Sequence, residues 1–258
     1  MKLCRFELLQ TPGRIHSGIF YDNRVYETDG KNPIAVHELG NIHFLSPIGH
    51  PSSIRVFERS GSKENPNYYY LNPTSHLGTQ SEWTAPSFVR ELDFEVRVAI
   101  AIGKGGDHLE MDHVGEHILG YTIFVNFFGH DLLRKTEPLG FCSVYPRDFS
   151  SIIGPLLITP EEFQNAENTD GKLPENWKMT FCINEKQIFE GNQEPEPSFV
   201  EMIKIASAGC PLQPGDILSS SSFNKPSLKE TELRRFLLPG DRVHVTIEGL
   251  GALIFKVS

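Results

Sequence analysis

The sequence predicts a strand-rich α+β fold. Short runs in which apolar and polar residues alternate dominate the chain, and 22 Gly and 18 Pro residues interrupt them. Few windows keep a helical period for more than about three turns, so helices are a minor part of the prediction. With 258 residues, the chain is long enough to bury a full core without disulfide bonds.

The N-terminal residues, 1–45, predict a small β module. Asp22-Asn23 is a typical turn pair between two alternating runs, so we expect a hairpin there. The stretch 49–67 is rich in Pro, Ser, Gly and charged residues, which predicts a loop or lid. We expect residues 46–258 to form the main domain.

The clearest strand runs from Leu92 to Ile102. Its even-numbered residues are all apolar and point to one face, and its odd-numbered residues point to the other. Glu95 and Arg97 therefore share a face of this strand.

Later signals predict two helices and several more strands. Capping patterns at 159–162 and 198–201 predict helix starts. Two Pro-Gly-Asp turns, at 214–216 and 239–241, each lead into an apolar run and predict strand starts. A glycine turn at 249–251 then precedes a closing strand.

Composition and charge exclude several classes of function. Lys and Arg number 24 against 33 Asp and Glu, a net charge of −9, and no basic block interrupts this acidity, so nucleic-acid binding is disfavoured. No run approaches the roughly 18 apolar residues of a membrane helix, and the first residues lack the apolar stretch of a signal peptide. We therefore expect a cytoplasmic protein. Four widely spaced cysteines indicate neither a zinc site nor a disulfide framework.

Several of these signals occur together in a fixed order, and this arrangement resembles the fumarylacetoacetate hydrolase family. The resemblance spans roughly the whole chain and implies a mixed β-roll with a small N-terminal β module, assembled as a homodimer. The segments that carry it are 92–104 (LDFEVRVAIAIGK), 119–126 (LGYTIFVN), 153–160 (IGPLLITP), 214–218 (PGDIL), 239–243 (PGDRV) and 247–251 (IEGLG).

The resemblance also implies a divalent metal, Mg²⁺, Mn²⁺ or Ca²⁺, that polarises a 2-oxo acid or 1,3-dicarbonyl substrate. In the family the metal strand reads Glu-x-Glu, but here it reads Glu95 and Arg97. A guanidinium has no lone pair to give and repels a dication. Phe127 aligns with the next ligand, an Asp, and Val56 aligns with an Asp of the lid. We therefore expect neither a bound metal nor another cofactor.

Two interpretations of Arg97 stay open. It forms an ion pair with Glu95 in a pocket without activity, or it binds a substrate carboxylate or enolate where the metal would lie. Arg147 replaces a family Lys and keeps a cation suited to an anionic substrate. We therefore predict that Glu95, Arg97 and Arg147 are catalytic residues.

Other aligned positions keep polar or large side chains. Ser222 matches a family Thr and Asn72 matches a subgroup that carries Asn, so with Phe127 they are predicted to bind substrate. His130 and Asp131 align with a family Arg-Asp pair, and the resemblance makes them candidate catalytic residues. A His beside an Asp can act as an acid or base near neutral pH, although the sequence favours a structural turn histidine here.

Three other patterns carry no function in our interpretation. His113 and His117 lie four apart on an expected helix, but they lack the zinc-protease order and predict a surface cluster. The serine run 219–222 has no glycine elbow, and the glycines at 103–106 lack the spacing of a phosphate loop.

Three hypotheses about function follow. The first is a metal-independent enzyme that isomerises, tautomerises, cyclises or cleaves a small dicarbonyl or enol compound, such as an intermediate of specialised metabolism. The second is a catalytically inactive partner subunit that keeps the fold. The third is a metal-dependent hydrolase or decarboxylase of the same family, which requires Glu58, Glu95 and Asp131 to converge on one ion.

Overall fold

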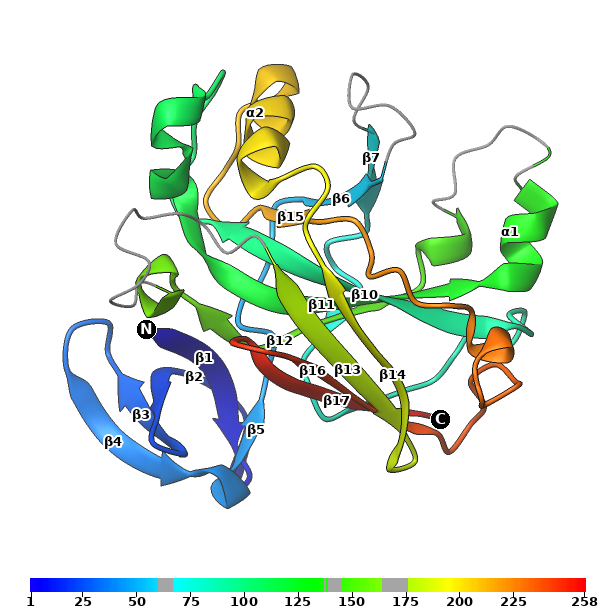
Figure 1. Ribbon diagram of the computed structural model, residues 1–258. Helices are drawn as coiled ribbons and strands as arrows, with labels where there is room; N and C mark the ends of the chain where they lie inside the picture. The colour runs from blue at the N-terminus through cyan, green and yellow to red at the C-terminus, as the bar shows by residue number, and fades with distance from the viewer. Residues whose placement is uncertain (60–66, 137, 139–144, 164–175) are drawn as a thin grey trace.

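Most of the chain folds as two β-sheets, as expected for a strand-rich α+β protein. The computed structural model describes residues 1–59, 67–136, 138, 145–163 and 176–258. In these parts of the chain, one sheet has 12 strands and the other has 5. Figure 1 shows the smaller sheet, with β13, β14, β16 and β17, lying across β10, β11 and β12 of the larger sheet.

The larger sheet has the order β4-β3-β2-β1-β12-β11-β10-β15-β6-β7, and β5 and β8 are added on β1 and β12. Its strands are β1 (Lys2–Leu8), β2 (Thr11–Tyr21), β3 (Arg24–Thr28), β4 (Pro33–Glu38), β5 (Ile42–Phe44), β6 (Ile54–Glu58), β7 (Asn67–Leu71), β8 (His76–Leu77), β10 (Leu92–Ile102), β11 (Ile118–Gly129), β12 (Ser151–Ile158) and β15 (Ile217–Ser219). The smaller sheet, in the order β14-β13-β16-β17-β9, contains β9 (Ser81–Trp83), β13 (Trp177–Ile183), β14 (Lys186–Gln193), β16 (Arg242–Ile247) and β17 (Gly251–Val257).

Helices are short. The α-helices are α1 (His130–Thr136) and α2 (Phe199–Gly209), and the 3₁₀ helices are η1 (Leu39–Asn41), η2 (Met111–His117), η4 (Tyr145–Arg147), η5 (Pro160–Phe163) and η6 (Leu228–Glu230). None of the helices in the described part of the chain has the length and apolar character needed to span a bilayer.

The N-terminal strands form the predicted hairpin and extend the larger sheet. Asp22 and Asn23 make the turn between β2 and β3 with φ angles of 49° and 55°, a conformation that Asp and Asn tolerate better than most residues. Leu3 of β1 pairs with Leu157 of β12, which joins this part to the rest of the sheet. These N-terminal strands lie to one side of the molecule in Figure 1. The division at residue 45 stays a prediction.

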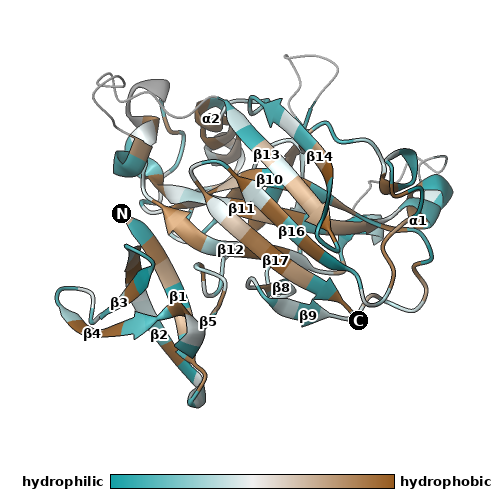
Figure 2. Ribbon diagram, turned by 60° about the horizontal axis from the view of Figure 1, so that its bottom comes forward, coloured by the Kyte–Doolittle hydropathy of each residue, from teal (hydrophilic) through white to brown (hydrophobic). Residues whose placement is uncertain are grey.

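Strand β10 has the predicted bounds and separates two hydrophobic clusters. Phe94 and Val96 belong to the main cluster, which the two sheets enclose, whereas Ala99 and Ala101 belong to a second cluster on the other face of the larger sheet. Figure 2 shows the hydrophobic stretches along β10, β11 and β17. Because side chains alternate along a strand, Glu95 and Arg97 share the face of the second cluster.

The main cluster contains a group of packed aromatic rings. Phe127 of β11 stacks on Trp83 with 4.1 Å between ring centroids and meets the edge of Phe255 at 5.1 Å. Phe94 contacts Phe181 and Phe255 in the same edge-to-face manner. Such pairs stabilise a core beyond the area they bury, so they hold the two sheets together.

One predicted helix is confirmed and one is not. Ser198 and Glu201 form a reciprocal capping box at the start of α2, as expected. The other start gives the 3₁₀ helix η5, and residues 164–175 beyond it lie outside the described residues. The two Pro-Gly-Asp turns are confirmed: their glycines have φ angles of 88° and 95° and precede β15 and β16.

Two sequence expectations about loops and surfaces are wrong. Within the predicted loop 49–67, residues 54–58 form the strand β6, because Ile54 and Val56 are fully buried between β15 and β7; residues 60–66 lie outside the described part. The expected surface histidine cluster is also wrong for His117, which is buried with its Nδ1 atom 2.7 Å from the carbonyl oxygen of Lys104. The side chain of His113 is not among those that the structure describes.

Phe127→Ala should lower the free energy of unfolding by about 3–5 kcal/mol, because it leaves a cavity between the two sheets. Urea denaturation followed by tryptophan fluorescence measures this change. Phe88→Ala is the matched control, since Phe88 is 52% exposed and its loss should lower the free energy of unfolding by less than about 1 kcal/mol. Equal losses in the two variants would contradict the assigned packing.

Candidate functional site

Arg97 lies at the centre of the candidate site. It is fully buried, with 0% of its surface exposed, although it carries a charge. Its Nη1 atom donates hydrogen bonds to the carbonyl oxygens of Phe57 (2.9 Å) and Ser220 (2.8 Å). Its Nη2 atom donates to Oε1 of Glu58 and to Oε2 of Glu95, both at 2.8 Å. Protein acceptors thus hold both terminal nitrogens of the guanidinium.

Arg147 completes the site from the other side of Glu95. Its Nη2 atom lies 3.0 Å from Oε1 of Glu95, so each oxygen of that carboxylate contacts a different arginine. The guanidinium of Arg147 also lies over the rings of Phe128 (5.3 Å) and Tyr69 (6.0 Å). We call the four charged residues the arginine–carboxylate cluster: Glu58, Glu95, Arg97 and Arg147. Its formal charges cancel.

Burial and mutual attraction oppose each other in this cluster. Burial disfavours the charged form of Glu95, but the guanidiniums of Arg97 and Arg147 outweigh it and lower the pKa of this carboxyl to about 2. Burial likewise disfavours the charge on Arg97, yet Glu95 and the other neighbours raise its pKa. The pKa of Arg147 is raised in the same way. All three side chains therefore stay ionised at neutral pH.

A divalent cation does not fit this set of residues. Mg²⁺, Mn²⁺ and Ca²⁺ need several oxygen ligands, and Glu58 and Glu95 direct theirs at the Nη2 atom of Arg97. The guanidinium would repel a dication placed beside it. Within the described residues, no three His, Cys, Asp or Glu side chains gather closely enough to hold a metal ion.

Asn126, and not Phe127, shares the face of Glu95. In the β10–β11 register Glu95 pairs with Asn126, and Phe94 pairs with Phe127. Residues that are directly opposite point to the same face, so Phe127 points into the aromatic core described above. The prediction that Phe127 lines the site is therefore wrong. A shift of one residue in an alignment exchanges the two faces of a strand.

Two buried polar side chains flank the cluster. The amide of Asn126 and the hydroxyl of Tyr69 have no hydrogen-bond partner among the residues that the structure describes. Asn126 is on β11 and Tyr69 is on β7, so in strand order they lie on opposite sides of Arg97. Burial raises the pKa of Tyr69, so its hydroxyl stays protonated and can donate. An unpaired buried polar group costs about 1–3 kcal/mol, which a bound molecule can offset.

His130 contacts the start of β10, and Asp131 contacts the segment before it. The Nε2 atom of His130 lies 3.1 Å from Oδ2 of the fully buried Asp93. The carboxylate of Asp131 accepts from the backbone N–H groups of Arg90 and Glu91, both at 3.4 Å. Neither side chain has a hydrogen bond to the arginine–carboxylate cluster.

Asn72 and Ser222 lie beside the site without joining the cluster. The Oδ1 atom of Asn72 accepts from the N–H and hydroxyl of Thr74 and closes a turn, while its own N–H donates to Asp148, the neighbour of Arg147. Ser222 is half-buried in the segment 220–223, whose backbone bonds to β10. The structure therefore gives neither side chain a hydrogen bond to the cluster among the described residues.

Sequence reasoning missed Tyr69 and Asn126 as site residues. Asn126 ends the segment LGYTIFVN, and its pairing with Glu95 depends on the register of two strands. Tyr69 is one of three consecutive tyrosines, and only the pairing of β7 with β6 shows which one faces the site. The alternation of β7 separates Tyr69 from Tyr68 and Tyr70, but it does not tell which of the two faces meets the site.

Comparisons with known proteins agree on the family and the fold. The family description "Fumarylacetoacetate (FAA) hydrolase C-terminal" matches residues 48–258. An uncharacterized protein of Staphylococcus epidermidis is 27% identical over 231 residues, which cover 84% of this chain and 72% of that protein. An uncharacterized protein of Staphylococcus aureus is 27% identical over 247 residues, with 90% and 77% coverage.

Solved structures of similar fold include enzymes. A 5-carboxymethyl-2-hydroxymuconate delta-isomerase from Mycobacterium smegmatis superposes with a TM-score of 0.79 at 19% identity, covering 100% of this chain and 99% of that one. A fumarylacetoacetate hydrolase from Exiguobacterium antarcticum gives a TM-score of 0.78 at 20% identity, with 100% and 99% coverage. At these sequence identities, the similarity shows a shared fold and nothing more.

Glu95→Gln should flatten the dependence of stability on acidic pH. The pKa of Glu95 in the folded protein lies below its ordinary value, so its contribution to stability is present above about pH 4.5 and is lost as pH falls toward about 2. The variant should therefore be less stable than the native protein at pH 6, and the gap should narrow toward pH 3.

Urea denaturation at a series of pH values measures this gap. The exposed Glu248→Gln is the control, and its gap to the native protein should stay near zero throughout. A gap for Glu95→Gln that stays constant from pH 6 to pH 3 would contradict the paired state of Glu95.

Proposed function

Because the chain belongs to the fumarylacetoacetate hydrolase family, we propose that it is an enzyme that isomerises or tautomerises a small dicarbonyl or enol compound without a divalent metal. The observation that carries this proposal is the guanidinium of Arg97 between Glu58 and Glu95. It supplies a fixed positive charge at the position where the family resemblance implies a carboxylate ligand. The similar structures that are named isomerases support the reaction class.

The reaction needs a place for the negative charge that develops on a carbonyl oxygen. In our proposal the hydroxyl of Tyr69 and the Nδ2 atom of Asn126 donate to that oxygen, because both are buried beside the cluster and lack partners among the described residues. The guanidinium of Arg147 stabilises the same charge at longer range. Donors fixed in a site without water stabilise an enolate far more than donors in solution do.

A carboxylate must also move the proton. Glu58 has 35% of its side chain exposed, against 14% for Glu95, so a substrate reaches it more easily. In our proposal a Glu58 oxygen takes a proton from the carbon beside the carbonyl group, and the electron pair moves to the carbonyl oxygen. The proton then returns to the far end of the enolate system, which completes the isomerisation without any co-reactant. Glu95 and Arg97 act as positioning residues.

A second candidate function is a catalytically inactive partner subunit. The specific observation in its favour is that both terminal nitrogens of Arg97 already bind protein acceptors, so this guanidinium has little left to offer a substrate. The metal-dependent alternative has less support, because Asp131 binds the backbone of residues 90 and 91 and does not meet Glu58 and Glu95. A homodimeric state and a cytoplasmic location remain predictions.

The ketonisation of enol-oxaloacetate tests the proposal. The fall in ultraviolet absorbance should be faster with the protein than in buffer, and excess EDTA should leave the rate unchanged. Tyr69→Phe should lower kcat/KM about 100-fold, because it removes one donor to the enolate oxygen. It should not lower stability, since the lost hydroxyl has no partner.

Tyr70→Phe is the matched control. Tyr70 is the next residue on β7, is 50% exposed and lies against Arg55 on the other face, so its loss should leave the rate unchanged. No acceleration over buffer would favour the inactive subunit, and an acceleration that EDTA abolishes would favour a metal-dependent enzyme.

A further inference from the structure

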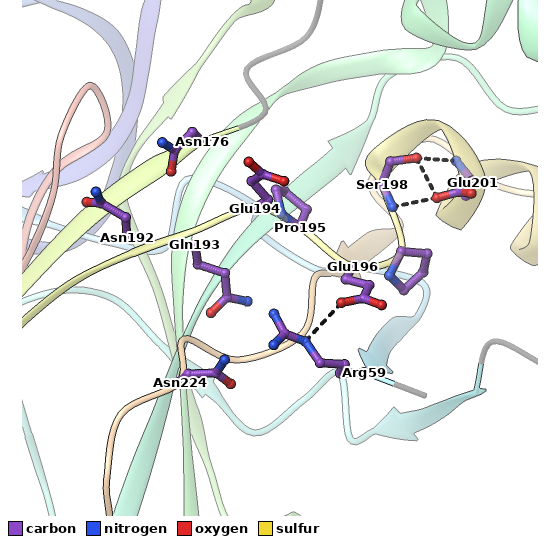
Figure 3. Close-up of a pocket in the computed structure, with 11 residues that line it drawn as sticks. Arg59, Asn176, Asn192, Gln193, Glu194, Pro195, Glu196, Ser198, Glu201 and Asn224 are labelled. Atoms are coloured by element: carbon purple, nitrogen blue, oxygen red, sulfur yellow. Dashed lines mark hydrogen bonds and ion pairs between the residues drawn. The ribbon is translucent and has the colours of Figure 1, made fainter. Parts of the chain in front are cut away.

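A pocket of about 590 Å³ lies where β14 ends and the chain turns into α2, and it contains no member of the arginine–carboxylate cluster. Glu58 turns toward the cluster, and the next residue, Arg59, lines the pocket. Figure 3 shows the side chains of Arg59, Gln193 and Asn224 directed toward one another. The pocket is lined by Arg59, Asn176, Asn192, Gln193, Glu194, Pro195, Glu196, Pro197, Ser198, Glu201 and Asn224.

Gln193 lines this pocket and carries a buried acceptor. Its residue is only 7% exposed, and its Nε2 atom donates to the carbonyl oxygen (3.0 Å) and the hydroxyl (3.1 Å) of Ser221. A backbone carbonyl only accepts, so this contact fixes which end of the amide is the nitrogen. The Oε1 atom is therefore the other end, and no described residue donates to it. A ligand at this atom must bring an N–H or O–H group.

The charges around the pocket favour a ligand with a positive charge. Among the described residues, three carboxylates line it, those of Glu194, Glu196 and Glu201, against one guanidinium, that of Arg59. Arg59 and Glu196 form an ion pair at 3.1 Å, with 43% and 42% of their side chains exposed. Exposed pairs of this kind contribute little stability, so another cation can take the place of Arg59. The net charge of −9 on the whole chain also disfavours an anion.

We propose that this pocket binds a small organic cation through a primary ammonium group. The ammonium donates one hydrogen bond to Oε1 of Gln193 and others to the carboxylate of Glu196, from which it displaces Arg59. Charge-assisted bonds to a carboxylate are roughly twice as strong as neutral ones, which gives the cation an advantage over a neutral alcohol. The volume lies within the usual range of small-molecule sites. This site is separate from the one proposed for the reaction.

Isothermal titration calorimetry with three four-carbon probes tests the proposal. Putrescine carries two ammonium groups, 1,4-butanediol carries two neutral hydroxyl groups, and succinate carries two carboxylates. Putrescine should bind at least 10-fold more tightly than butanediol, and succinate should not compete with putrescine. The affinity for putrescine should fall as salt rises from 0.05 to 0.5 M, because ions screen exposed charges. Equal binding of putrescine and butanediol, displacement of putrescine by succinate, or no binding of putrescine up to 10 mM would overturn the proposal.

Three variants separate this pocket from general attraction to an acidic surface. Glu194→Gln/Glu196→Gln should weaken putrescine binding at least 10-fold, and Gln193→Met, which removes the buried acceptor, should weaken it as well. Glu232→Gln is the control, since Glu232 is exposed, pairs with Lys186 and lies outside the pocket. If all the variants lose affinity equally, the binding is non-specific and the proposal fails. Glu194 and Glu196 lie on the surface, so their variant tests the site even if Gln193→Met does not fold.

Discussion

The buried guanidinium of Arg97 joins three separate parts of the chain, and the geometry of the candidate site depends on it. It binds the backbone of Phe57 and the carboxylate of Glu58 on β6, Glu95 on its own strand, and the carbonyl of Ser220 after β15. Removing one partner from a buried ionic group leaves the others uncompensated, at a cost of about 3–5 kcal/mol. The buried charge of Arg97 therefore helps to hold these strands in their relative positions.

A charge that is part of the protein acts differently from a bound metal ion. A dication attracts both oxygens of a dicarbonyl and exchanges water for substrate, whereas Arg97 has committed both of its terminal nitrogens to protein acceptors. In the proposed function, the polarisation of a substrate therefore depends on neighbouring groups such as Tyr69 and Asn126, which lack hydrogen-bond partners among the described residues. The chain keeps the fold of the family, and the proposed function assigns the chemistry at its centre to other residues.

Local patterns in the sequence predicted what depends on one strand or one turn. The alternation of residues 92–102 placed Glu95 and Arg97 on one face, and the capping box at Ser198 predicted α2. Such local patterns could not predict contacts between strands that are far apart in the sequence. The ion pair between Arg97 and Glu58 joins residues 39 apart, and the choice between Asn126 and Phe127 depends on a pairing register that turns and packing set together.

Calorimetric titration with Mn²⁺ tests most directly whether Arg97 takes the place of the metal. The native protein should give no binding heat up to 1 mM, because its guanidinium already holds Glu58 and Glu95. Arg97→Glu/Asn126→Asp restores carboxylates on the correct face and should bind Mn²⁺, and its Tm should rise with the metal concentration. Arg97→Glu/Phe127→Asp should bind it more weakly, since residue 127 points into the core and adds no carboxylate to the site. Tight, stoichiometric binding of Mn²⁺ by the native protein would contradict the account.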